Sequence, residues 1–325
     1  MSRSIGARHP LLKEFSQSTI FFPEFAIAFS KLCDAIELCN LTKSPMSAIV
    51  CGPSGVGKTK LLQEAIDKYA HEFEDEQPDG LYNRETVIYF EVPAPVTIRQ
   101  MVESMLIKLG IDNARGSIAH LTAMLITQLK TRGVELIFLD EIQALCLPSA
   151  DTIRVPALRW LVNFMDELGI PVILAGTEEC RNITDYLEPF GNRYPWMIVL
   201  NFVEYDRRPD SHYHRILERF DYIMHSLWPM TSEVHLNDVD IAAPLFVATS
   251  GNLKWISTIL IMAFHRCLSR EKKSGLTRED LKYACDQYTL KYSITTKNPF
   301  LLDLAACTEV ITNTEHTRKM KRVPE

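Results

Sequence analysis

Eight consecutive residues carry the clearest chemical signature in the chain, in the order Gly52-Pro53-Ser54-Gly55-Val56-Gly57-Lys58-Thr59. They match the pattern Gly-x-x-x-x-Gly-Lys-Ser/Thr, and they stand between an apolar strand pattern and an amphipathic helix pattern. The glycines allow backbone N–H groups to turn inward around phosphates at the positive end of the helix dipole. We expect the Lys58 ammonium on the β- and γ-phosphates and the Thr59 hydroxyl on Mg²⁺. The sequence therefore predicts an ATP·Mg²⁺ site along Gly52 to Lys60.

Two carboxylates form a second candidate group, because Asp140 and Glu141 follow directly after the apolar run 136–139. Ligands of open α/β sheets bind at the carboxyl ends of the strands. We expect Asp140 to hold Mg²⁺, directly or through water, and Glu141 to orient and deprotonate the attacking water. The alternative, in which the acidic pair caps a helix that starts at Ile142, is weaker because the phosphate-binding pattern lies upstream.

Thr177 is a third polar candidate, at the end of the neighbouring apolar run. A hydroxyl there can hydrogen-bond the attacking water or the γ-phosphate. It can equally cap the helix that follows. The sequence leaves both interpretations of Thr177 open.

These groups need a scaffold, and the apolar runs predict one. Strands are expected at 47–51, 86–92, 136–140, 171–175 and 196–202, with helices at 22–39, 60–69, 97–109, 117–132 and 155–168. The acidic segment 71–85 reads as a loop with turn residues at 78–80. Val, Ile and Leu on both faces of strands that alternate with helices predict a parallel sheet covered on both sides.

The strand signal stops after Tyr205. Further helices are expected at 213–226, 238–249, 254–269 and 277–290. The predicted fold is therefore α/β, a three-layer P-loop core with a parallel five-stranded sheet plus a small all-helical lid. The corresponding division is a lead-in segment and helix at 1–45, the core at 46–205, the lid at 206–292 and a tail at 293–325. The tail lacks clear periodicity and ends with Arg318, Lys319, Lys321 and Arg322, which a solvated end would explain.

Composition excludes several classes of protein. The 325 residues carry a formal charge of −6, which argues against an all-over nucleic-acid-binding surface but leaves room for a local basic strip. No apolar run approaches the roughly 20 residues of a membrane-spanning helix, and no signal peptide is apparent, so we expect a cytoplasmic protein. The eight cysteines include no Cys-x-x-Cys pair and are expected to be reduced structural thiols.

The order of these features resembles the AAA+ ATPases: a P-loop, an Asp-Glu strand, a strand-end threonine and then a helical lid. The resemblance implies a nucleotide-sensing role for Lys254, which stands where the family usually has arginine and lacks the bidentate guanidinium. It also implies an arginine that completes the neighbouring subunit's site. Arg193 is the first choice for that arginine, Arg181 the second, and a solvated surface arginine is the alternative.

A narrower resemblance, to the TniB/TnsC transposition regulators of transposons and their CRISPR-associated relatives, covers about residues 9 to 290. It rests on His9-Pro10 with the helix at 22–39, on the runs 140–143 and 175–178, and on 251–256. It implies a homo-oligomeric ring or filament on double-stranded DNA, nucleoid-associated in that state, with a transposase and a TniQ-type targeting protein as partners. It also implies DNA phosphate contacts from Thr97 and Arg99, although Thr97 can equally cap a helix and Arg99 can simply be solvated.

Two other functions compete with this one. A replication-initiator or helicase-loader relative would normally add a DNA-reading module after the lid, and the stretch after Leu290 is short for one. A nucleotide-switched signalling protein of the STAND type would continue into long sensor repeats, and the sequence has no internal repeat.

Overall fold

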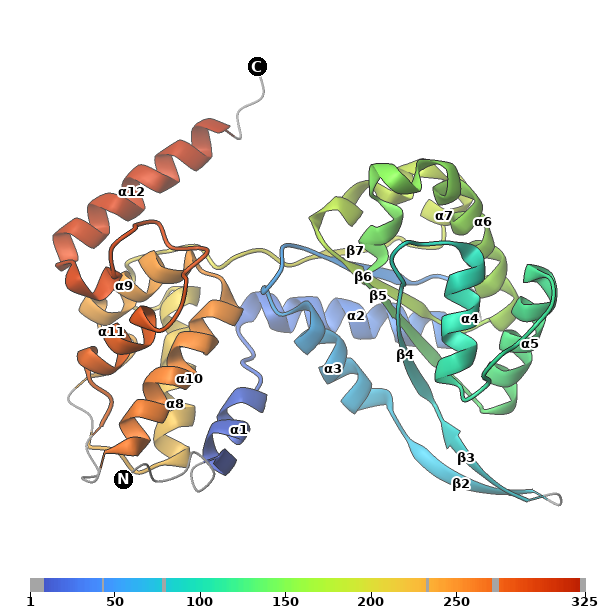
Figure 1. The fold of residues 1–325 in the computed structure, drawn as a ribbon, viewed down its shortest axis with the longest axis horizontal. Coiled ribbons are helices and arrows are strands. Elements are labelled where there is room, and N and C mark those ends of the chain that lie inside the picture. Colours follow the sequence, from blue (N-terminus) through green and yellow to red (C-terminus); the bar gives the residue numbers. More distant parts are fainter. Residues whose placement is uncertain (1–8, 43, 78–79, 232–233, 271–274, 322–325) are drawn as a thin grey trace. The chain divides into compact units, whose positions relative to one another are not determined.

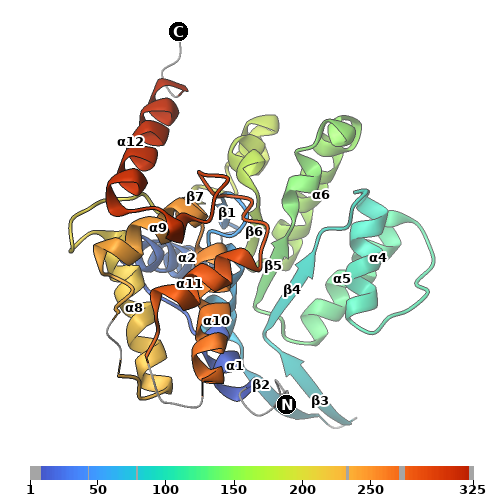
Figure 2. The same ribbon diagram turned by 60° about the vertical axis from the view of Figure 1, so that its left-hand side comes forward.

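The computed structural model describes residues 9–42, 44–77, 80–231, 234–270 and 275–321, with the backbone alone described at residue 9, 72–84 and 315–321. The chain forms two compact units (Figures 1 and 2). One unit is the continuous segment Glu24–Asn201, and the other is built from the segments on either side of it. Each unit has its own hydrophobic core.

A five-stranded sheet forms the centre of the first unit. Its strand order is β4-β5-β6-β1-β7, and its pairings are parallel. The strands span β1 (Ala48–Cys51), β4 (Val87–Glu91), β5 (Leu136–Asp140), β6 (Val172–Gly176) and β7 (Trp196–Val199). Every residue of β1, β5 and β6 is buried, as expected for parallel strands with helices on both faces. The sequence-based prediction of a parallel five-stranded α/β core is confirmed.

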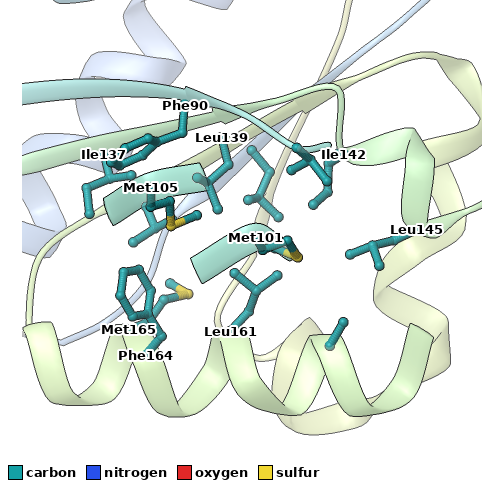
Figure 3. Packing of buried hydrophobic residues seen from close by; sticks show 14 of the residues in the cluster. Phe90, Met101, Met105, Ile137, Leu139, Ile142, Leu145, Leu161, Phe164 and Met165 are labelled. Atoms are coloured by element: carbon teal, nitrogen blue, oxygen red, sulfur yellow. The ribbon is translucent and has the colours of Figure 1, made fainter. Parts of the chain in front are cut away.

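Helices connect the strands and cover the sheet. They are α2 (Pro23–Thr42), α3 (Lys58–Tyr69), α4 (Ile98–Lys108), α5 (Ile118–Thr131), α6 (Asp151–Leu168) and α7 (Glu188–Gly191). Right-handed crossovers place α3 on one face of the sheet and α4, α5 and α6 on the other, and Figure 1 shows this arrangement. Figure 3 shows Met101 and Met105 from α4 beside Leu161 and Phe164 from α6 in the core on the second face.

The second unit is helical. Its helices are α1 (His9–Gln17), α8 (His212–Leu227), α9 (Val239–Thr249), α10 (Leu253–Ser269), α11 (Arg278–Asp286) and α12 (Leu304–Lys321). Phe15 from α1 is 1% exposed and packs against Phe220 of α8 and Phe264 of α10, with ring centroids 5.9 and 5.6 Å away. The segment expected to lead into the core thus contributes α1 to this unit and α2 to the sheet unit. Within the part of the chain that is described, no helix has both the length and the apolar character needed to span a bilayer.

Two segments differ from the sequence-based prediction. The expected loop at 71–85 contains an antiparallel hairpin, β2 (Glu72–Gln77) with β3 (Gly80–Glu85), although residues 78 and 79 of its turn lie outside the described residues. The polar composition of this segment hid the hairpin from the sequence analysis. Pairing of the two strands satisfies their backbone hydrogen bonds without an apolar face. The predicted tail includes α12, where Cys307 and Ile311 are buried. The basic side chains at its end lie outside the described residues.

A buried carboxylate links two segments of the helical unit. Asp221 of α8 accepts hydrogen bonds from the Leu236 backbone N–H (3.2 Å) and from the His235 Nδ1 (2.8 Å). The His225 Nδ1 lies 3.5 Å from the same carboxylate. Both oxygens of Asp221 therefore accept hydrogen bonds, which accounts for the burial of this charged group.

We predict a pH-dependent contribution of His235 to the stability of the helical unit. The hydrogen bond to Asp221 raises the pKa of His235 above its ordinary value of 6.5. A raised folded-state pKa means that the stabilisation is fully present below 6.5 and is lost as the pH rises through the folded value. The stability difference between the wild type and His235→Gln in urea unfolding should therefore be larger at pH 6 than at pH 8.5. His265→Gln on α10 is the control, and a difference for His235→Gln that is independent of pH would contradict the prediction.

Candidate functional site

The phosphate-binding pattern forms the turn between β1 and α3. Gly55 and Gly57 have φ angles of 86° and 102°, a left-handed conformation that glycine adopts without a Cβ penalty. Gly57 is the N-cap of α3, and no side chain caps this helix end. The first turn of α3 therefore presents the backbone N–H groups of Lys58 and Thr59 at the positive end of the helix dipole, where an anion binds.

Gly52, the first residue of the turn, lies against the backbone that follows β7. A Cβ at Gly52 would lie 2.0 Å from the Leu200 carbonyl oxygen, and the φ angle there is 152°. The Leu200 N–H donates to the Cys51 carbonyl oxygen at 2.9 Å. Glycine at position 52 therefore allows the turn to pass directly over the end of β7.

Lys58 is half-buried and turned into the loop. Its Nζ donates to the Gly52 carbonyl oxygen at 2.7 Å and to the Pro53 carbonyl oxygen at 2.9 Å. Burial lowers the pKa of Lys58, and the charges of Asp140 and Glu141 act in the opposite direction. The lysine and both carboxylates are thus close enough for their charges to interact. The two carbonyl groups are neutral hydrogen-bond partners of Lys58. Phosphate oxygens can replace them and form stronger, charge-assisted hydrogen bonds with the lysine, so these residues fit ATP.

Asp140 is 6% exposed at the end of β5. Its Oδ1 accepts the Glu141 N–H at 2.7 Å, and its Oδ2 accepts the Tyr89 hydroxyl at 2.6 Å. Burial, followed by the hydrogen bond to Asp140, raises the pKa of Tyr89, which therefore stays a donor. A carboxylate held by two donors keeps lone pairs for a cation, and oxygen ligands suit Mg²⁺. Asp140 together with the Thr59 hydroxyl fits that ion.

Tyr89 is a site residue that the sequence analysis missed. Parallel pairing places Tyr89 opposite Phe138 and Glu91 opposite Asp140. Side chains two residues apart in a strand share a face, so Tyr89 and Asp140 are diagonal neighbours. A tyrosine two residues before the end of an adjacent strand is the signal, but reading it requires the strand order.

Glu141 is exposed and has an unusual backbone conformation, with φ 62° and ψ 26°. A non-glycine residue in this region costs about 1–3 kcal/mol, and such residues cluster at functional sites. Its side chain does not cap the short 3₁₀ helix Ile142–Leu145. Its Oε2 instead accepts a hydrogen bond from the Gln143 side-chain amide.

Thr177 follows β6 and stands at the start of the 3₁₀ helix Glu178–Tyr186 without making a capping hydrogen bond. Its hydroxyl donates to Glu179, which lowers the pKa of that carboxyl group. Its backbone N–H donates to the Gln143 Oε1 at 3.2 Å. Because β6 lies between β1 and β5, the phosphate-binding turn, Thr177 and the Asp140–Glu141 pair occupy neighbouring strand ends. The structure brings together these three groups of the sequence prediction.

Comparison with known proteins identifies the segment that carries these groups. The family described as AAA domain matches residues 41–184, a span that includes the phosphate-binding turn, Asp140, Glu141 and Thr177. Residues 41–184 therefore match an AAA domain. With its complete P-loop and paired carboxylates, this domain makes the protein an ATPase. No curated protein matches the sequence significantly.

Solved structures share the fold. The Pyrobaculum aerophilum Cdc6p structure has a TM-score of 0.55 at 15% identity, covering 86% of this chain and 72% of that chain. The Aeropyrum pernix ORC1 protein in complex with DNA has a TM-score of 0.53 at 17% identity, covering 85% and 68%. The Aeropyrum pernix ORC2 protein, in ADPNP–ADP complexes, has a TM-score of 0.51 at 12% identity, covering 88% and 69%. Identities this low establish the AAA+ fold and nothing narrower.

The candidate arginines of the sheet unit already have partners within the chain. Arg193 forms a bidentate pair with Asp166, with two N–O distances of 2.9 Å. Arg181 contacts the Asn201 Oδ1 and Glu178, each at 3.0 Å. Lys254 is exposed in the first turn of α10, in the helical unit.

The two candidate DNA contacts lie after β4 of the AAA domain. Thr97 is the N-cap of α4, and its hydroxyl oxygen accepts the Gln100 N–H at 3.1 Å. Arg99 pairs with Glu103 at 2.9 Å and donates to the Gly116 carbonyl oxygen at 2.8 Å. Both residues are exposed.

We predict that Gly52→Ala lowers the free energy of unfolding of the protein far more than Gly169→Ala does. Both glycines have positive φ angles, but an added Cβ meets nothing within 4 Å at Gly169 and meets the Leu200 carbonyl oxygen at Gly52. Gly169→Ala should cost roughly 1–2 kcal/mol for the left-handed backbone alone. Gly52→Ala should cost at least about 3 kcal/mol, within the range of severe core substitutions. Urea unfolding followed by tryptophan fluorescence tests this, and equal costs at the two positions would contradict it.

Proposed function

We propose that the protein is an ATP-dependent, DNA-binding regulator of transposition that assembles on double-stranded DNA with ATP and leaves it after hydrolysis. The observation that carries the ATP-dependent part is the convergence of Lys58, the Asp140–Glu141 pair and Thr177 on adjacent strand ends of an AAA domain. The DNA-binding part is supported by the fold shared with the DNA-bound Aeropyrum pernix ORC1 protein. The resemblance to the TniB/TnsC regulators adds a transposase and a TniQ-type targeting protein as partners.

Within this function, each residue at the strand ends has a defined task. Lys58 and the backbone N–H groups of the P-loop hold the β- and γ-phosphates. Thr59 and Asp140 would hold Mg²⁺, which neutralises charge on the transferring phosphoryl group. Glu141 accepts a proton from the attacking water, and Thr177 hydrogen-bonds that water or the γ-phosphate.

The proposed DNA contacts are Thr97 and Arg99. The Arg99–Glu103 pair is solvent-exposed, with 45% and 34% of the two side chains accessible, and such pairs are worth only about 0–1 kcal/mol. Exchanging Glu103 for a DNA phosphate therefore costs little. One such contact in each subunit is weak, but many subunits repeating it along DNA give strong binding. Assembly can thus compensate for the formal charge of −6.

We predict that DNA binding requires a nucleoside triphosphate and a functional P-loop. The wild type should bind random-sequence duplex DNA with ATP or a slowly hydrolysed analogue, and should not bind with ADP. Lys58→Ala should lose this binding because its phosphate site is incomplete. Glu141→Gln should stay on DNA longer than the wild type in ATP because the proton acceptor is missing. Fluorescence anisotropy of labelled DNA measures each case.

Measuring DNA affinity at several salt concentrations, with a control substitution at another arginine, tests the proposed phosphate contacts. The logarithm of affinity should fall with the logarithm of salt by about 0.9 for each phosphate contact, so Arg99→Ala should flatten the slope. Arg159→Ala, an exposed arginine on α6, should leave the slope unchanged. A folded, ATP-bound protein that ignores DNA at low salt would refute the proposal and favour a nucleotide-switched signalling role.

We further propose that Arg193 completes the ATP site of a neighbouring subunit. Releasing Arg193 from Asp166 exposes a guanidinium that can stabilise charge in the transition state, which is worth roughly 10³–10⁵ in rate. Arg193→Ala and Lys58→Ala should each be inactive alone. Their mixture should regain ATPase activity, because Lys58→Ala supplies the arginine and Arg193→Ala supplies the P-loop. A mixture as inactive as its parts rejects Arg193, and the same mixture with Arg181→Ala tests the second choice.

A second candidate function is replication initiation, which the fold shared with Cdc6p and the ORC proteins favours. An initiator would discriminate among DNA sequences, whereas the proposed regulator would bind the backbone of any duplex. Competition of labelled random-sequence DNA with a pool of genomic fragments separates the two. Strong enrichment of particular fragments would favour the initiator.

A further inference from the structure

The side chain of Gln143 joins the ends of two neighbouring strands. Its Nε2 donates to the Glu141 Oε2, on the segment that follows β5. Its Oε1 accepts the backbone N–H of Thr177, on the segment that follows β6, at 3.2 Å. One amide group thus contacts both the proposed proton acceptor and the residue proposed to contact the γ-phosphate.

The end of β6 accommodates this side chain closely. A Cβ at Gly176 would lie 2.8 Å from the Gln143 Oε1 and 2.5 Å from the Cys180 sulfur. Gln143 and Cys180 thus occupy the space that a side chain at position 176 would take. This packing limits the positions that the Gln143 amide can take.

Glu141 needs such a partner. Its carboxylate is exposed on a left-handed backbone, and an exposed glutamate side chain otherwise samples several rotamers. The hydrogen bond to Gln143 occupies Oε2 and leaves Oε1 for a water molecule. A proton acceptor must lie within hydrogen-bond reach of the proton that it takes, so fixing one oxygen helps to place the other.

We propose that Gln143 is a positioning residue that sets the orientation of Glu141 according to the position of Thr177. When the γ-phosphate contacts the Thr177 segment, the Thr177 N–H moves, and the Gln143 Oε1 that accepts its hydrogen bond moves with it. The Nε2 of the same amide then changes the orientation of the Glu141 carboxylate. The inference rests on the proposed role of Glu141 in ATP hydrolysis. It does not depend on DNA binding or on a transposase.

Two substitutions distinguish the two hydrogen bonds of the Gln143 amide, which are called its Glu141 arm and its Thr177 arm. Gln143→Met keeps the length of the side chain and removes both hydrogen bonds. Gln143→Glu keeps an oxygen for the Thr177 N–H but places a carboxylate against Glu141. We expect both variants to lower kcat roughly 10- to 100-fold, the scale of a misplaced catalytic group. The Kd for a fluorescent ATP analogue and the KM should change less than about threefold, because neither arm contacts the P-loop.

A double-variant cycle distinguishes positioning from general damage. In single-turnover hydrolysis, Gln143→Met should cause no further loss in a Glu141→Gln background, because the group that it positions is already disabled. A further loss of the full size in that background, or a wild-type kcat in Gln143→Met, would overturn the proposal. A wild-type kcat in Gln143→Glu alone would overturn the Glu141 arm of the proposal.

The same measurements show which proposal has failed. If Glu141→Gln hydrolyses ATP as fast as the wild type, the proposed role of Glu141 is wrong. If Glu141→Gln is inactive and Gln143→Met is fully active, the role of Glu141 stands and the inference about Gln143 alone is wrong. Unfolding curves for each variant confirm that the activities compared are those of folded protein.

Discussion

The parallel hydrogen bonding of β1, with β6 on one side and β7 on the other, is the constraint on which the site depends. The register pairs Cys51 with Gly176 and with Val199. The next residues, Gly52 and Thr177, therefore leave the sheet at the same level. Because β5 continues the sheet beyond β6 with Leu139 opposite Leu174, Asp140 ends its strand close to that level. Three chemically different groups thus lie at neighbouring strand ends on one edge of the sheet.

The packing of the sheet also holds in place two features of the site that are unfavourable by themselves. Glu141 has a left-handed backbone, which costs about 1–3 kcal/mol, and Asp140 is a carboxylate withdrawn from water. Each is attached to a strand whose residues are all buried, so neither segment can relax without breaking core packing. Tyr89 and the Glu141 N–H replace the water that Asp140 loses, as burial of a charged group requires.

Polar contacts at this edge link the strand ends to each other. Asp140 is held from β4 through Tyr89, and Glu141 is held toward β6 through Gln143. Neither Glu141 nor Thr177 makes a side-chain cap to the short helix that follows it. The two candidate arginines lie outside this set and pair with acidic or amide groups elsewhere in the sheet unit.

The sequence by itself determined the elements and residues whose signals are contiguous. Strands such as 136–140 were predictable because parallel strands buried on both faces are unbroken apolar runs, and the P-loop because its chemistry lies in consecutive backbone groups. The hairpin at 72–85 escaped because backbone pairing needs no apolar pattern, and α12 because it buries only a few positions such as Cys307 and Ile311. The contacts of Tyr89 with Asp140, of Gln143 with Thr177 and of Arg193 with Asp166 were decided only by the tertiary structure. Each joins residues 27 to 51 positions apart, and such contacts depend on strand order and helix packing, which no local pattern encodes.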